Sequence, residues 1–125
     1  MKHLKKIRKF SRKKDQREAM LKTMLGSFIT KGRITTTEAK AKELKRISDR
    51  IISRFKQVVA TDEKGSKLAV VRYLTAQLPK NVGMEQIKSI AGRFSKRESG
   101  FSRVIKKGAR RSDSAKMAIL EMLSE

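Results

Sequence analysis

The chain has 125 residues, of which 33 are Lys or Arg and 12 are Asp or Glu, so its formal net charge is +21. It contains no Cys, a single His and no long apolar run, which excludes disulfides, thiolate metal sites and a membrane-spanning helix. A chain of this length can form one small domain with its own core, and its excess of cations predicts a polyanionic partner.

Residues 1–14 form a basic arm that carries eight cations and no acid. These cations are Lys2, Lys5, Lys6, Arg8, Lys9, Arg12, Lys13 and Lys14, and His3 lies among them. Because like charges repel and the segment has few apolar side chains, we expect the arm to order only against an anion, with nucleic acid as the partner. An alternative is an organelle presequence, since Leu4, Ile7 and Phe10 would form a stripe on a basic helix.

Residues 15–125 are expected to form a single globular domain that opens with a helix over about Asp15–Lys31. Its apolar residues repeat at helical spacing: Met20, Leu21, Met24, Leu25, Phe28 and Ile29. Asp15 is expected to cap this helix, and Gly32 to end it. A brief strand over 33–36 then leads into a long helix over about Glu38–Ala60.

Two shorter helices are predicted next. The third has an apolar stripe that Pro79 closes: Leu68, Val71, Leu74 and Leu78. The fourth has a similar stripe: Met84, Ile87, Ala91 and Phe94.

The last quarter is ambiguous from periodicity alone. Residues 101–106 resemble a strand, while 115–123 contain helix-forming residues throughout. However, Lys107–Ser114 has the length and composition of a hairpin loop, and Met117–Leu123 is apolar on both faces like a central strand.

A second cationic cluster lies on this predicted hairpin: Arg103, Lys106, Lys107, Arg110 and Arg111. Such cations would project beyond the domain and contact phosphates, with Asp113 bracing the loop. Cations of the long helix are expected to be solvated surface. Phe28, Phe55 and Phe94 are expected in the core, which leaves few aromatics for base stacking.

The sequence gives no basis for catalysis. It lacks a glycine-rich phosphate loop, and its acids are too dispersed for a paired-carboxylate or two-metal site. We therefore expect no cofactor, no metal and no small-molecule substrate.

Three segments resemble the bacterial large-subunit ribosomal protein family numbered seventeen. They are Met1–Lys6 continuing to Arg17–Leu21, then Gly32–Leu44 with its run GRITTTEAKAKEL, and finally Gly100–Val104 continuing to Ile119. Ile7 and Ser11 stand where the resemblance leads us to expect glycines, and Gln16 stands where it leads us to expect a histidine. The resemblance begins at Met1, which argues against a cleavable presequence.

The resemblance implies an α+β fold in which about four helices pack on a small three-stranded mixed sheet, with a basic extended N-terminal arm. It also implies a non-enzymatic structural protein of the large ribosomal subunit that binds ribosomal RNA and lies among other ribosomal proteins near the polypeptide exit region. The expected location is therefore the large ribosomal subunit in the cytoplasm, with an organelle ribosome as the alternative. The candidate RNA-binding residues are the arm cations with His3, the five hairpin cations, Arg17 and Arg33. Two alternatives are a DNA-compacting chromosomal protein and a nucleic-acid enzyme.

Overall fold

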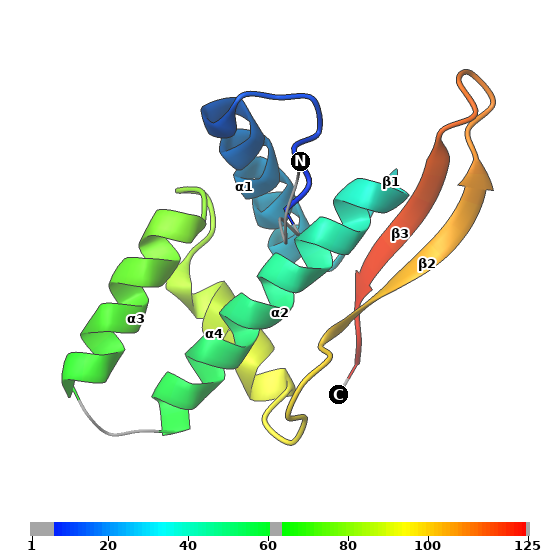
Figure 1. The fold of residues 1–125 in the computed structure, drawn as a ribbon. Coiled ribbons are helices and arrows are strands. Elements are labelled where there is room, and N and C mark those ends of the chain that lie inside the picture. The colour runs from blue at the N-terminus through cyan, green and yellow to red at the C-terminus, as the bar shows by residue number, and fades with distance from the viewer. Residues whose placement is uncertain (1–6, 61–63, 125) are drawn as a thin grey trace.

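The computed structural model describes residues 7–60 and 64–124, which form four α-helices and three β-strands (Figure 1). In chain order these are α1 (Lys14–Lys31), β1 (Arg33–Thr37), α2 (Glu38–Ala60), α3 (Lys64–Gln77), α4 (Met84–Arg93), β2 (Ser102–Ala109) and β3 (Lys116–Met122). The predicted α+β class is confirmed.

The ends of α1 depend on backbone conformation more than on side-chain capping. Lys13 is the residue before the helix, and its side chain makes no capping hydrogen bond. The predicted cap at Asp15 is therefore wrong, because Asp15 lies inside the first turn, where its charge favours the helix dipole. The predicted end at Gly32 is confirmed. Its φ of 75° is left-handed, and its N–H donates to the Phe28 carbonyl at 2.7 Å.

The three strands form one sheet in the order β1-β3-β2. Arg33 lies opposite Glu121 in one ladder and Ser102 opposite Met122 in the other, and both ladders are antiparallel. The prediction of a mixed sheet is therefore wrong, because the two parallel strands, β1 and β2, lie on opposite edges of β3 and do not pair. The central position of β3 confirms the strand interpretation of its apolar sequence over the helical one.

The core lies between α2 and the other elements. Its fully buried side chains include Leu25, Phe28, Leu44, Ile51, Leu74, Ile87, Phe94, Phe101 and Leu120. Full burial of one such large side chain contributes about 1.5–3 kcal/mol. The core spans α1 to β3, so the described part of the arm contributes no fully buried residue to it.

The second half of the predicted α3 stripe, Leu74 and Leu78, is buried as expected, but the first half is not. Leu68 and Val71 remain 52% and 39% exposed, whereas Val70 and Tyr73 pack against the core beside the buried Leu74. The adjacent residues Val70 and Val71 both fit a helical period, so spacing alone selected the wrong one. The packing of α3 on α2 decided the face.

Polar contacts fix the base of the hairpin to α2. Ser102 is buried in β2 and donates to Asp49 Oδ1 at 2.8 Å, while Lys45 donates to Asp49 Oδ2 at 2.8 Å. The Leu123 N–H donates to the Phe101 carbonyl at 3.0 Å. The hairpin therefore leaves the domain in a direction set by the folded body.

Candidate nucleic-acid interface

The β2–β3 hairpin forms the first cationic surface. Figure 1 shows it extending away from the helices, and every residue from Ile105 to Ser114 is exposed. The extra residue at Lys107 forms a bulge in the ladder, and Gly108 beside it has a φ of 98°. Bulges increase local twist and redirect side chains, so the strands turn as they leave the core.

The hairpin loop is closed by its own side chains. Arg110 donates from Nε and Nη2 to the two carboxylate oxygens of Asp113 at 2.9 and 2.6 Å, and the Ala115 N–H donates to Asp113 Oδ1 at 3.2 Å. The Arg110 hydrogen bond, supported by the Ala115 N–H, lowers the pKa of Asp113 to about 2. The predicted bracing role of Asp113 is confirmed.

The hairpin cations differ in whether the protein already pairs them. Arg103 donates to Glu121, Lys106 lies 3.8 Å from Glu38, and Arg110 is paired with Asp113 as above. Three further cations form no ion pair with any described residue: Lys107, Arg111 and Lys116. Lys107 and Arg111 therefore remain available to an external anion, whereas the charge of Lys116 also acts on Glu38.

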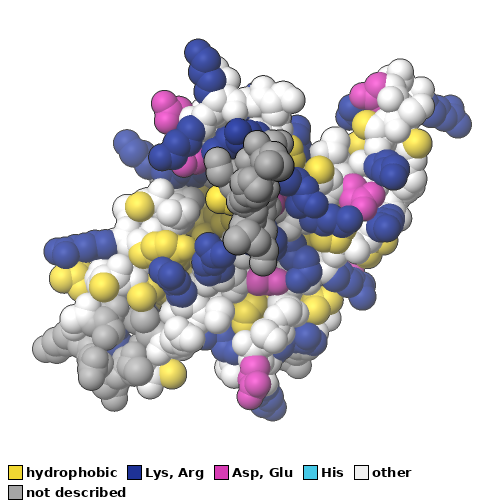
Figure 2. Space-filling view, viewed as in Figure 1, with side chains coloured by type: hydrophobic (Ala, Val, Ile, Leu, Met, Phe, Trp, Pro, Cys, Tyr) yellow, Lys and Arg dark blue, Asp and Glu magenta, His cyan; other side chains and the backbone are white. Residues whose placement is uncertain are grey.

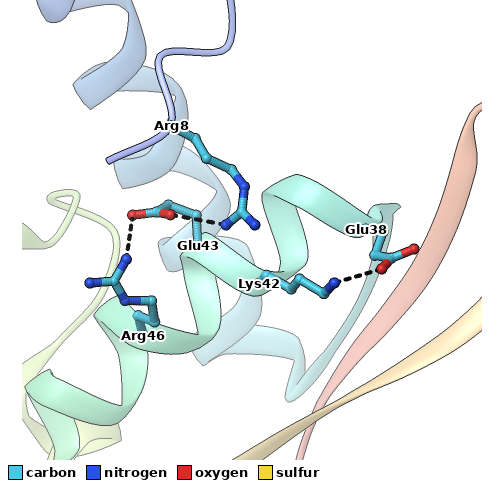
Figure 3. A network of polar contacts seen from close by, with 5 residues as sticks. All are labelled: Arg8, Glu38, Lys42, Glu43 and Arg46. Carbon is cyan, nitrogen blue, oxygen red and sulfur yellow. Dashed lines mark hydrogen bonds and ion pairs between the residues drawn. The ribbon is translucent and has the colours of Figure 1, made fainter. Parts of the chain in front are cut away.

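The described part of the arm is attached to α2 through an acid. Arg8 Nη1 lies 3.4 Å from Glu43 Oε2, and Arg46 Nη1 lies 3.6 Å from Glu43 Oε1 (Figure 3). Glu43 itself is only 6% exposed. A buried carboxylate is costly unless it is paired, so Glu43 provides a reason for the arm to lie against this helix.

The arm then turns before α1 begins. The Arg12 N–H donates to the Lys9 carbonyl at 3.2 Å, and Phe10 and Ser11 have φ values of 54° and 52°. A left-handed Ser11 agrees with the glycine expected there from the family resemblance. The remaining arm cations are exposed: Lys9, Arg12, Lys13 and Lys14. The predicted residues Lys2, His3, Lys5 and Lys6 lie outside the described residues.

Two further candidates lie outside both clusters. Arg17 is half-buried on α1, and Arg33 is exposed at the start of β1. Arg33 and Arg103 lie opposite Glu121 on its two sides in the sheet. Arg33 therefore shares the hairpin's sheet, whereas Arg17 lies on α1.

Some of the cations of α2 already have partners within the protein. Lys42, Lys45 and Arg46 form ion pairs with acids of the same helix, and Arg54 lies 4.3 Å from the centre of the Tyr73 ring. In Figure 2, Lys and Arg side chains lie along the hairpin and around the arm, while acids are scattered.

The aromatic residues do not form a base-stacking surface. Phe28, Phe55 and Phe94 are buried, as predicted, and Phe101 joins them with its ring centre 5.3 Å from that of Phe94.

Within residues 7–60 and 64–124 there is also no cluster of His, Cys, Asp or Glu that could hold a metal ion. No helix in this part of the chain is long and apolar enough to span a membrane.

Sequence reasoning missed two cations that the fold brings to these surfaces. Lys116 begins β3 and lies opposite Ala109 near the hairpin loop. Lys42 lies in the first turns of α2 and lines a hollow that Arg8 and Lys116 also line. The only sequence signal for Lys116 was its place just after the predicted loop, and Lys42 carried none that set it apart on its helix.

A small α+β domain with a basic arm and a projecting basic hairpin is typical of proteins that bind nucleic acid through its phosphate backbone. Comparison with known proteins gives the family. The family described as "Ribosomal protein L17" matches residues 20–123. The chain therefore belongs to the ribosomal protein L17 family, which confirms the resemblance seen in the sequence.

Individual relatives match over almost their whole length. The large ribosomal subunit protein bL17 of Natranaerobius thermophilus is 38% identical over 116 residues, which cover 93% of this chain and 96% of the relative. The protein of the same name from Pelobacter propionicus is 35% identical over 125 residues, covering 100% and 93%. That from Rubrobacter xylanophilus is 38% identical over 124 residues, covering 99% and 97%.

Proposed function

We propose that this chain is a structural, non-enzymatic constituent of the large ribosomal subunit, where it binds ribosomal RNA. Membership of the ribosomal protein L17 family carries this conclusion. Its place of action is then the cytoplasm, within the subunit, among ribosomal RNA and other ribosomal proteins.

The chemistry of this role is phosphate neutralisation. Each cation that meets a phosphate releases counterions, which gives affinity that does not depend on base sequence and falls with salt. The exposed and unpaired hairpin cations support the hairpin as one contact surface. Because the folded body fixes the hairpin, little entropy is lost when RNA binds there.

The arm serves as the second contact surface in this proposal. Residues 1–14 form an arm and 15–125 a single domain, and the Arg8–Glu43 pair holds the root of the arm. Cations at the two surfaces would let phosphates from separate RNA segments approach each other, since their mutual repulsion is reduced.

Sedimentation tests the proposed function. The native protein should co-sediment with large ribosomal subunits at moderate salt and be released as salt is raised. Recovery with chromosomal DNA instead of subunits would contradict the proposal and favour the DNA-compacting alternative. Turnover of a nucleic-acid substrate that survives removal of bound RNA would favour an enzyme.

A further inference from the structure

The arm and the hairpin, far apart in sequence, meet at a hollow beside the start of α2. The hollow has a volume of about 320 Å³ and is lined by Arg8 of the arm, by Thr37–Ala39 and Lys42, and by Ala115 and Lys116 of the hairpin. Figure 3 shows Arg8 reaching α2 from the arm and Lys42 extending along the same helix toward Glu38.

Cations outnumber acids in this hollow. Glu38 accepts a hydrogen bond from Lys42 at 2.7 Å and lies 3.8 Å from Lys106. The Lys42 hydrogen bond lowers the pKa of Glu38, and the charges of Lys106 and Lys116 lower it further. One carboxylate thus faces three cations.

Arg8 adds a further positive charge at the rim. Its partner Glu43 is shared with Arg46, so one acid again faces two cations. The internal acids therefore position the cations of the hollow without neutralising all of them.

We propose that this hollow binds one backbone phosphate of ribosomal RNA, with Arg8, Lys42 and Lys116 as its donors. The proposal rests on the proposed function and deepens it, because it names one shared contact for two surfaces that the sequence presented as separate. A phosphate has several strong acceptor oxygens, so donors from three segments can share it. Lys42 lies on a long helix and Lys116 on the central strand, so both are held by rigid elements.

A phosphate at this point would join the arm to the hairpin. Arg8 is the last cation before the arm turns at Lys9–Arg12. If Arg8 contacts the same phosphate as Lys116, that contact would fix the direction in which the arm leaves the domain. The RNA would then hold the arm and the hairpin in one fixed relative position.

Phosphate-ethylation interference tests the shared contact. A full-length transcript of bacterial large-subunit ribosomal RNA, ethylated at random phosphates, is partitioned by the full chain into bound and free pools. Ethylation of certain phosphates should block binding of the unaltered protein. Three variants should share one change in this pattern: Arg8→Gln, Lys42→Gln and Lys116→Gln. In each of them, ethylation of the same single phosphate should no longer reduce binding. Arg111→Gln, in the loop outside the hollow, should lose interference at a different phosphate.

Affinities of double variants give a second measure. Two donors to one phosphate are coupled. The fold-loss of affinity in the double variant Arg8→Gln with Lys116→Gln should therefore be smaller than the product of the two single-variant losses, by a factor of at least about three. Arg8→Gln with Arg111→Gln should give the product within about twofold. Lys116→Arg keeps the charge and should retain the interference pattern.

The outcomes separate this inference from the function on which it rests. Loss of interference at three different phosphates, or effects of Arg8→Gln and Lys116→Gln that simply multiply, would overturn the shared site. A protein that binds the transcript without salt dependence, with no phosphate sensitive to ethylation, would overturn the proposed function as well. The altered side chains are exposed, so thermal melts should stay within a few degrees of the unaltered protein.

Discussion

Asp113 closes the hairpin loop through Arg110 and the Ala115 N–H. Contacts in the folded loop depress the pKa of Asp113 to about 2. The ionised carboxylate therefore stabilises the loop fully above the ordinary carboxyl pKa near 4, and this stabilisation is lost as pH falls through about 2. Loop order should therefore fall between about pH 4 and pH 2.

Replacing this carboxylate should release the loop without unfolding the domain. In Asp113→Asn, the Ala115 amide should exchange faster with solvent at neutral pH, while the thermal midpoint stays nearly unchanged because the pair is exposed. Amide exchange followed by NMR checks this result. Glu85→Gln, at an exposed acid on α4, is the control and should leave Ala115 protected.

Gly26 is a packing residue on α1. A Cβ at this position would meet Pro79 Cγ at 2.4 Å, so Gly26→Ala must displace the segment that follows α3. We expect a loss of about 1–3 kcal/mol in the free energy of unfolding. At Gly92 on α4 a Cβ would meet nothing within 4 Å, so Gly92→Ala should stabilise the protein by up to about 1 kcal/mol. Denaturant unfolding measures both, and equal effects of the two changes would contradict this role for Gly26.

At the scale of elements, Glu43 connects the arm to α2. In Glu43→Gln, the Arg8 and Arg46 pairs lose their charged acceptor, so the arm root should loosen while the core remains intact. Glu43 is buried but Arg8 remains 43% exposed, so solvent screens the pair and we expect it to contribute about 1 kcal/mol. Exchange of the Arg12 amide should then rise roughly two- to fivefold. Glu18→Gln on α1 is a matched control. Unchanged exchange at Arg12 in Glu43→Gln would show that other contacts hold the root.

The hairpin and α2 both carry exposed cations, and a set of three from each differs in how many members the protein pairs with an acid. Replacing Lys106, Lys107 and Arg111 by Gln should flatten the slope of log affinity against log salt by roughly two to three units, if each meets a phosphate. The matched set Lys40, Lys45 and Arg46 should change the slope by less than about one unit, since two of its members are paired with acids. Binding to large-subunit ribosomal RNA across a salt series decides between them. A larger effect from the α2 set would place the RNA on the helical face.

At the scale of the whole molecule, folding and RNA binding should separate. Deleting residues 1–13 stops before α1 and removes seven cations but no residue of the described core. The truncated protein should keep a cooperative thermal transition, while its salt slope flattens by up to roughly five to six units. Loss of the transition would mean that the arm is part of the fold, and an unchanged slope would remove it from the RNA interface.

The sequence by itself determined which segments become helices and which carry charge. Spacing of apolar residues predicted α1, α2 and α4, and Gly32 marked the end of α1, because these signals act over a few neighbouring residues. The arm and hairpin clusters were equally visible, since runs of cations need no fold to be recognised. Family resemblance supplied the strand at β3, which local propensity left open.

Tertiary structure decided what depends on partners distant in the chain. It made the sheet antiparallel by placing β3 between β1 and β2, and it turned α3 so that Val70 and not Val71 faces the core. It also selected which cations are paired, since Arg103 meets Glu121 and Arg8 meets Glu43 across separations that no local pattern encodes. The hollow that brings Arg8 beside Lys116 exists for the same reason: charge is a property of each residue, but its neutralisation and convergence are properties of the packed chain.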